Sequence, residues 1–309
     1  MSGWWALLYA GGLLIGLGAV GLLGAAGIQA ALGLLSSGRP ARKSAPRPAL
    51  GRAAASLHRK MKALARPTLL LLPTDRPVFS KFGGAPDLDD RHANWPTSKV
   101  TRRFPKREIT TSMGFIAQLD LSEVRAAGGP DWLPDQGRLY FFAEPWMGAA
   151  LHVAVLDGLK SPIAVPVLPK GFPLVERRIA MTPATSYPDL EWLVDDLSEL
   201  DIDSDALDRL ADFPSAHMPT PEHRIGGHAS AIQGLNMEFE CEQMLAALEG
   251  REPKATRLRD TDWRLLLQVD TDADLKTKWG DGGRLYYWIR EADARAGDFS
   301  KIQMVGQSH

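Results

Sequence analysis

Two short motifs, each with a glutamine and an aspartate separated by one residue, are the first feature that could do chemistry. They are Gln118-x-Asp120 and Gln268-x-Asp270, and each ends an apolar run that is typical of a β-strand. Alternate residues of a strand point to one face, so each motif places an amide beside a carboxylate. Such a pair either binds a polar ligand or satisfies the backbone groups of a turn, which is the more common role of buried polar groups.

A second candidate is His223-Arg224-Ile225-Gly226-Gly227-His228, which combines basic side chains with paired glycines. Backbone N–H groups in such a loop could bind an anion, although paired glycines more often mark a tight turn. His217, His223 and His228 do not have the spacing of a zinc site, and Cys241 is the only cysteine. The sequence therefore predicts no metal site and no bound cofactor.

Two acidic runs begin like calcium loops, Asp201-x-Asp203-x-Asp205 and Asp270-x-Asp272-x-Asp274. A calcium loop needs glycine at its sixth position, where these runs have Ala206 and Leu275. We therefore interpret the first run as the acidic start of a helix and the second as an acidic turn.

The segment Trp279-Gly280-Asp281-Gly282-Gly283 lies between two expected strands and predicts the tip of a hairpin. Its glycines allow positive φ, and Asp281 either accepts hydrogen bonds from the turn or faces a ligand. The indole of Trp279 can fill the space beside the tip and needs a hydrogen-bond acceptor if it is buried.

The chain contains no nucleophile elbow, phosphate-binding loop, dinucleotide fingerprint or metalloprotease helix. Cys241 stands between Glu240 and Glu242, whose charges would raise its pKa and weaken it as a nucleophile. The sequence thus assigns no catalytic residue and favours a binding module. The alternative is a hydrolase built from His223 and three carboxylates. These carboxylates belong to Asp120, Asp270 and Asp281.

The elements that must position these residues are mainly short strands, separated by Gly, Pro, Asp and Asn. Strands are expected at residues 114–121, 137–142, 150–157, 163–168, 264–270 and 283–289. The spacing of apolar residues predicts helices over residues 187–213 and 236–248. This mixture predicts an α+β fold.

One series of motifs occurs twice in the same order, which predicts a β-rich domain built from two similar halves by internal duplication. A Gly-Gly turn, an apolar strand with its Gln-x-Asp motif, and a Gly-Arg-Leu-Tyr strand recur at about residues 78–170 and 215–309. We expect the halves to face each other across a pseudo-two-fold axis, with a cleft at their boundary. The ligand-binding candidates expected there are Gln118, Asp120, His223, Arg224, Gln268, Asp270, Trp279 and Asp281.

Taken in order, these motifs resemble the YwqG-like family of bacterial proteins of unknown function, over roughly residues 78–309. The resemblance departs from the family at the end, where Ser308-His309 follow Gln307 in place of an aromatic residue. It implies a fold but no secure activity, and family members often look like accessory or immunity-type proteins. The matching segments are Ser80–Pro86, Trp95-Pro96, Phe115–Leu121, Leu133-Pro134, Gly137–Leu139, His223–Gly227, Ile232-Gln233, Leu265–Asp270, Trp279–Tyr286 and Asp298–Ser300.

The N-terminal part of the chain is its most apolar part. Residues 4–35 contain no charged side chain, and about 20 apolar residues suffice for a helix to cross a membrane. The alternative is a cleaved signal peptide, but here the positive charge follows the apolar run instead of preceding it. We therefore expect a single N-terminal transmembrane helix, with Trp4, Trp5 and Tyr9 in the headgroup region.

Residues 36–66 predict a basic, Pro- and Arg-rich juxtamembrane linker. Nine basic residues and no acid lie from Arg39 to Arg66, whereas all 37 acidic residues follow Pro67. Residues 53–66 include an amphipathic basic helix that either contacts anionic lipid or is a solvated stop-transfer segment. Positive charge beside a span stays in the cytoplasm, so we expect a single-pass protein of the bacterial inner membrane with its N-terminus outside.

The main domain, residues 67–309, is expected to lie in the cytoplasm and to fold without the linker. Its acidic balance excludes a nucleic-acid partner. The remaining partners are an unknown protein or a polar small molecule.

Overall fold

The computed structural model describes residues 50–309 except 92–93, 104–105, 145–146, 155–160, 169–171, 173, 195–200 and 255–260. Two compact units divide the chain, and residues 99–110 belong to the first of them. Most of residues 99–110 belong to two strands, β3 (Thr97–Arg103) and β4 (Lys106–Ser112), which form a two-stranded sheet. Every other element described below lies in the main unit, which comprises residues 50–98 and 111–309.

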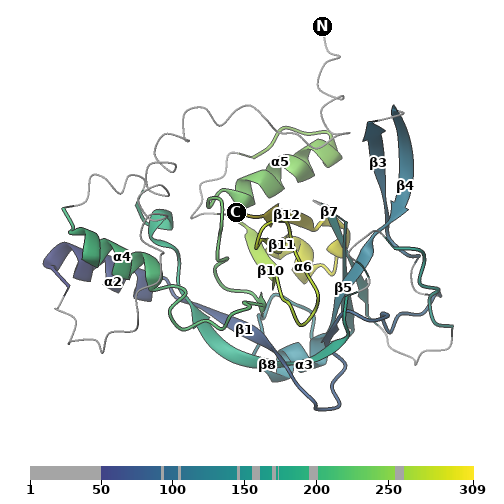
Figure 1. Ribbon diagram of the computed structural model, residues 1–309, viewed down its shortest axis with the longest axis horizontal. Helices are drawn as coiled ribbons and strands as arrows, with labels where there is room; N and C mark the ends of the chain where they lie inside the picture. The colour runs from purple at the N-terminus through teal and green to yellow at the C-terminus, as the bar shows by residue number, and fades with distance from the viewer. Residues whose placement is uncertain are drawn as a thin grey trace, which may run out of the picture. The chain divides into compact units, whose positions relative to one another are not determined.

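A nearly closed, ten-stranded antiparallel sheet forms the centre of the main unit (Figure 1). The order across it is β12-β11-β10-β9-β1-β8-β2-β5-β6-β7. Its edge strands approach each other, since a Cβ added at Gly148 in β7 would lie 2.7 Å from the Met304 Cβ in β12. The strands are β1 (Arg66–Pro73), β2 (Lys81–Phe82), β5 (Gly114–Asp120), β6 (Arg138–Glu144), β7 (Met147–Val153), β8 (Arg177–Ser186), β9 (Arg224–Ile225), β10 (Trp263–Asp270), β11 (Arg284–Arg290) and β12 (Gln303–Gln307).

From the centre of the sheet outward, the strands follow one another in the same succession in both directions. From β8 the order is β2, β5, β6 and β7, and from β1 it is β9, β10, β11 and β12. The irregularities match as well, because β5 has a bulge between Phe115 and Ala117 and β10 has one between Leu265 and Leu267. We refer to β2-β5-β6-β7 as the first half and to β9-β10-β11-β12 as the second half.

The two central strands are exchanged between the halves. Strand β1 precedes the first half in the chain but pairs with β9 of the second, through Leu69↔Ile225 and Leu70↔Arg224. Strand β8 precedes the second half but pairs with β2 of the first, through Lys81↔Arg178 and Phe82↔Arg177. A long antiparallel pairing between β1 and β8 joins the halves.

Helices α3 and α4 begin where an acidic side chain satisfies one of the first N–H groups. Asp120 accepts from Ser122 N at the start of α3, and Asp203 accepts from Ala206 N at the start of α4. The expected acidic helix start at Asp203 is therefore confirmed. The helices are α2 (Arg52–Ala63), α3 (Leu121–Ala126), α4 (Ser204–Asp212), α5 (Met237–Glu249) and α6 (Glu291–Arg295), with 3-10 turns η1 (Leu190–Trp192) and η3 (Phe299–Lys301).

Helix α2 packs against α4 and belongs to the main unit, which begins at Leu50 (Figure 1). Leu57 and Met61 of α2 share a buried cluster with Leu190 and Leu210. The amphipathic helix expected in the linker is present, but its apolar face is covered by protein. The expected domain boundary at Pro67 falls inside β1, because that strand begins at Arg66.

The largest hydrophobic core spans both halves. It contains Phe141 of β6 and Tyr287 of β11, whose rings meet edge to face at 5.1 Å. The buried Tyr287 hydroxyl also donates to the Phe142 carbonyl oxygen at 3.0 Å. One core thus holds the two halves in a single folding unit.

Several elements differ from the expectations. The helix expected over 187–213 is wrong, because β8 ends at Ser186 and only η1 and α4 are helical in the described part of that range. Residues 163–168 form no regular strand, and Val167 is 96% exposed. Residues 4–35 lie outside the described residues. Among the described helices, none has the length and apolar character needed to cross a membrane.

Candidate functional site

Gln118 is fully buried and holds a turn of the first half. Its Oε1 accepts from Asp87 N at 2.8 Å, and its Nε2 donates to Phe79 O at 2.8 Å. The same Nε2 donates to the Asp87 carboxylate at 2.8 Å. Each polar atom of the amide thus has a partner in the chain, as a buried amide requires.

Gln268 makes the corresponding contacts in the second half. Its Oε1 accepts from Ser230 N at 3.0 Å, and its Nε2 donates to Glu222 O at 3.0 Å. The residue is fully buried. Both glutamines therefore form hydrogen bonds to backbone groups on either side of a Gly-Gly turn.

The two aspartates of the motifs are also buried and paired. Asp120 accepts from Arg138 Nε at 3.1 Å, and Asp270 lies 3.1 Å from Arg284 Nε. Asp270 also accepts from Glu222 N at 2.9 Å. These carboxylates connect neighbouring strands.

Both ring nitrogens of His223 are occupied. Nδ1 accepts from Asp270 N at 3.0 Å, and Nε2 lies 3.2 Å from the Asp272 carboxylate. Burial lowers the pKa of His223, which favours a neutral ring that donates from Nε2. Arg224 is buried as well and lies 2.8 Å from the Glu222 carboxylate. The loop considered as a possible anion site therefore has its cationic group already paired.

Trp279 and Asp281 lie in the expected hairpin turn. The Trp279 indole donates to Asp270 O at 3.1 Å, and Gly283 N donates to Trp279 O at 2.8 Å. Asp281 is exposed, and its carbonyl oxygen accepts from His309 N at 3.0 Å. Gly280 and Gly282 have positive φ, as the turn requires.

Seven of the eight candidate residues thus lie in two separate networks beneath turns, one in each half, whereas Asp281 is exposed in the hairpin turn. The arrangement supplies no ring nitrogen or carboxylate pair open to a substrate around His223. In the described part of the chain, no group of three or more His, Cys, Asp or Glu side chains could hold a metal ion. Burial raises the pKa of the Cys241 thiol, and Glu238 and Glu240 raise it further.

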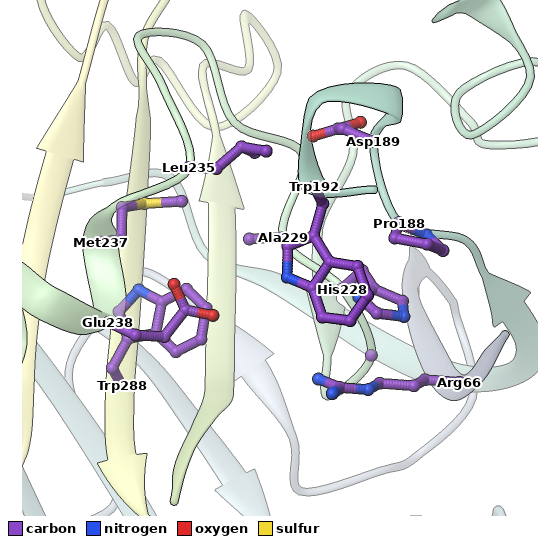
Figure 2. A pocket seen from close by; sticks show the side chains of 11 residues that line it. Arg66, Pro188, Asp189, Trp192, His228, Ala229, Leu235, Met237, Glu238 and Trp288 are labelled. Atoms are coloured by element: carbon purple, nitrogen blue, oxygen red, sulfur yellow. The ribbon is translucent and has the colours of Figure 1, made fainter. Parts of the chain in front are cut away.

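A pocket not expected from the sequence lies around Arg66 (Figure 2). The Arg66 guanidinium and the Glu238 carboxylate reach into it from opposite sides. The rings of Trp192 and His228 meet at 5.6 Å near Arg66. The pocket is lined by Arg66, Pro188, Asp189, Trp192, Gly227, His228, Ala229, Leu235, Met237, Glu238 and Trp288.

Burial shifts the titration of the acidic and imidazole groups of this pocket. It raises the pKa of Glu238 to about 7 and that of Asp189 to about 6, with Arg66 and Arg224 opposing these respective shifts. Burial also lowers the pKa of His228 to about 4, so the ring is neutral at pH 7. Its Nε2 lies 2.8 Å from Leu64 O, which can only accept, so Nε2 carries the proton.

Arg66 is the cation that lacks a fixed partner. Among the described residues, its half-buried guanidinium forms no hydrogen bond or ion pair. Burial and the nearby charge of Arg264 lower its pKa, whereas Glu238 raises it. The buried Trp288 Nε1, which belongs to the same pocket, also has no hydrogen-bond partner in the described part of the chain. Two donors among the residues that line this pocket therefore have no acceptor in the described part of the chain.

A groove of about 410 Å³ shares Arg66 with this pocket. Leu69, Trp132 and Leu265 give it a buried apolar floor, and Arg264, whose guanidinium lies 2.9 Å from the Glu291 carboxylate, also lines it. Residues 128–132 of its wall follow α3, whereas Gly226, Gly227 and Arg264 belong to the second half. The groove therefore lies at the boundary where a cleft was expected, but other residues line it.

No sequence signal identified this site. Arg66 is the last of nine basic residues and resembles the others until β1 and α5 fold around it. Glu238 belongs to an apolar helical pattern, and Asp189 follows a proline. Their proximity depends on segments far apart in the chain.

The raised pKa of Glu238 predicts that the stability of the folded chain depends on pH. Its pKa is about 7 in the folded state and 4.5 ordinarily, so the folded state holds a proton that the unfolded chain loses between these values. Stability should therefore fall as pH rises from about 4.5 to about 7. Glu238→Gln should raise the free energy of unfolding by about 1–3 kcal/mol at pH 8 and leave it nearly unchanged at pH 4.5. Urea titrations at both pH values measure this, and an equal gain at both would contradict the assignment.

Fold and pocket together define a β-rich domain with two similar halves, a pocket of mixed charge around Arg66 and an adjoining groove at the boundary of the halves. The chain belongs to the family described as Domain of unknown function (DUF1963), which matches residues 80–307. No curated protein matches the chain.

Proposed function

We propose that this chain is a membrane-tethered binding module whose cavity at Arg66 recognises an anionic group of its ligand. The observation that carries the proposal is the half-buried Arg66 guanidinium, which has no partner among the described residues. A buried charge without a partner costs free energy, and an anion that pairs with it recovers part of that cost.

The surrounding donors favour the same ligand chemistry. The Trp288 indole nitrogen has no acceptor among the described residues, and Arg264, which is paired with Glu291, lines the adjoining groove. A carboxylate or phosphate offers several acceptor oxygens and pairs well with a guanidinium. The YwqG-like resemblance is compatible with this role, because it implies accessory or immunity-type proteins that act through a protein partner.

Inorganic phosphate is a simple probe of the anion site. For a millimolar Kd, about 50 mM phosphate should raise the Tm of the full-length, detergent-solubilised chain by about 2–5 °C over chloride at equal ionic strength. Arg66→Ala should abolish this gain. Arg59→Ala, which removes an exposed cation of α2, should keep it. An equal gain in wild type and Arg66→Ala would contradict the proposal.

The membrane tether rests on the apolar residues 4–35 and the nine basic residues that follow. A reporter active only in the cytoplasm should give signal when fused after His309, because basic residues beside a span are retained there. A reporter active only outside the cytoplasm should stay silent at the same position. The reverse pattern would contradict the proposed orientation, and signal in a soluble fraction would contradict the tether.

A further inference from the structure

The two halves differ at the wall of the pocket, although corresponding strands build them. Strands β6 and β11 begin with the same residues, Arg-Leu-Tyr, and two aromatic residues follow, so that Phe142 corresponds to Trp288. In the first half, the Trp95 ring meets the Phe142 ring edge to face at 5.4 Å. In the second half, the buried Trp288 Nε1 has no partner in the described part of the chain. The second half therefore has an N–H donor where the first half has a phenyl ring.

Strand register shows a second difference of the same kind. The pair Lys81↔Arg178 corresponds to the pair Arg224↔Leu70. Counting back four residues from Arg178 and from Leu70 places Arg66 where the first half has Leu174, which is buried in the main core. Both N–H donors of the pocket wall thus stand at positions that are apolar in the first half.

The pocket also contains two acids, and their surroundings differ. Asp189 accepts a hydrogen bond from the backbone of Ala231 and lies near the positive charge of Arg224. Glu238 accepts only from its own backbone N–H among the described residues, and Figure 2 shows it opposite Arg66. Glu238 is therefore the acid whose charge is not yet balanced by a partner.

The charged groups around Glu238 come from several elements. Arg66 of β1 and Arg264 of β10 are the cations that favour its ionised form, but the Arg264 guanidinium already lies 2.9 Å from the Glu291 carboxylate. His228 is neutral at pH 7, as described above, and Glu240 is the other acid in the first turn of α5. Arg66 is thus the unpaired cation that Glu238 faces in the described part of the chain.

An anion and an ionised Glu238 compete for this one guanidinium. When it is ionised, Glu238 repels an anion in the pocket and is itself attracted to Arg66. When it is protonated, its O–H becomes a third donor beside Arg66 and Trp288. Two acidic groups in one small site share a proton more readily than they hold two negative charges. Binding of an anion therefore favours the protonated form of Glu238.

The size of the pocket restricts which anionic group can enter. Its free volume is about 20 Å³, a little more than one water molecule requires, so it admits the oxygens of an end group but not the body of a ligand. A carboxylate presents two oxygens and one negative charge. A phosphate group presents more oxygens and carries more than one charge near pH 7. A carboxylate therefore matches both the space and the single unpaired cation.

We propose that the pocket binds a carboxylate group of its ligand together with one proton, which Glu238 takes from solvent and donates to the bound carboxylate as an O–H hydrogen bond. Arg66 and the Trp288 indole supply the other donors. This inference rests on the proposed function, because it uses the same anion site and names the ligand class and its dependence on pH.

Acetate is a suitable probe, because a simple carboxylic acid is almost fully ionised at pH 6 and above. The rise in Tm of the full-length, detergent-solubilised chain with acetate concentration, against chloride at equal ionic strength, gives a Kd at each pH. The pKa of Glu238 is about 7, so the Kd should be about tenfold higher at pH 8 than at pH 6. Equal Kd values at both pH values would overturn the inference.

The variant Glu238→Gln tests the assignment by a gain of binding. Its amide cannot ionise and still offers an N–H donor, so it should bind acetate about tenfold more tightly than wild type at pH 8. Its Kd values at pH 6 and pH 8 should agree within about threefold. A chain that fails to fold could not produce this gain. Glu252→Gln, which changes an exposed acid after α5, should keep the wild-type dependence on pH. A wild-type pH dependence in Glu238→Gln would overturn the inference.

The phosphate experiment separates the two proposals. Phosphate stabilisation that depends on Arg66, together with no effect of acetate at pH 6, would overturn this inference and leave the anion site standing. Arg66→Ala should abolish the effect of acetate, and an unchanged effect in that variant would place acetate elsewhere and overturn the inference. Failure of both anions to stabilise the wild-type chain would overturn both proposals.

Discussion

A chain that begins at Pro67 should fail to fold, whereas a chain that begins at Leu50 should unfold cooperatively. The shorter chain lacks α2 and so exposes the apolar side chains of Leu190 and Leu210. It also loses the Leu64 carbonyl that accepts from His228 and the Arg66 carbonyl that accepts from Ser186 Oγ. Circular dichroism and size-exclusion chromatography of the two chains would show the difference. A folded, monodisperse chain from Pro67 onward would contradict the role given to α2.

A point substitution tests the same contact without truncation. Met61 of α2 is fully buried in the cluster that α2 shares with α4. Met61→Ala should therefore lower the free energy of unfolding by about 2–5 kcal/mol. Lys60→Ala, on the exposed side of the same helix, should change it by less than about 0.5 kcal/mol. Urea titrations of both variants in the chain that begins at Leu50 provide the measurement.

Gln268→Ala should be among the most destabilising polar substitutions in the chain. It leaves Ser230 N and Glu222 O without partners in a buried site, at about 1–3 kcal/mol for each group. Gln118→Ala should have a similar effect, because it leaves Asp87 N and Phe79 O without hydrogen-bond partners. We expect each variant to lose about 2–5 kcal/mol in urea titrations.

The control for this pair is Gln243→Ala, which removes an exposed amide from α5 and should be nearly neutral. If the glutamines instead bound a ligand, Gln118→Ala and Gln268→Ala would keep the wild-type free energy of unfolding. Unchanged stability in both variants would therefore contradict the structural role that we assign to the Gln-x-Asp motifs.

The strands that carry these motifs could be predicted because each one combines an apolar run with turn residues at its ends. Strands β5, β6, β10 and β11 lie close to their expected positions. Strand β1 was missed, since its four leucines follow a basic segment and stand between two prolines. Strand β8 was missed because its exposed threonines, Thr182 and Thr185, interrupt any apolar pattern.

The candidate site shows a different limit. The expected pairing of an amide and a carboxylate on one strand face is present at Gln268 and Asp270, but the partners that occupy them come from residues 222–230. Residue types alone do not distinguish a buried structural network from a ligand site. Arg66 became a candidate only from its surroundings, because its neighbours in space include Glu238 and Arg264.

The exchange of β1 and β8 also bears on the order of events during synthesis. Strand β1 leaves the ribosome first, but its partners β8 and β9 begin only at Arg177 and Arg224. Pairing across such a sequence distance raises the contact order and slows folding. The four leucines of β1 therefore stay uncovered while most of the chain is made, which makes the nascent chain a substrate for chaperones that hold apolar segments. The first half completes its pairing only when β8 has been made, and the second half pairs with β1, a strand made before all of its own strands.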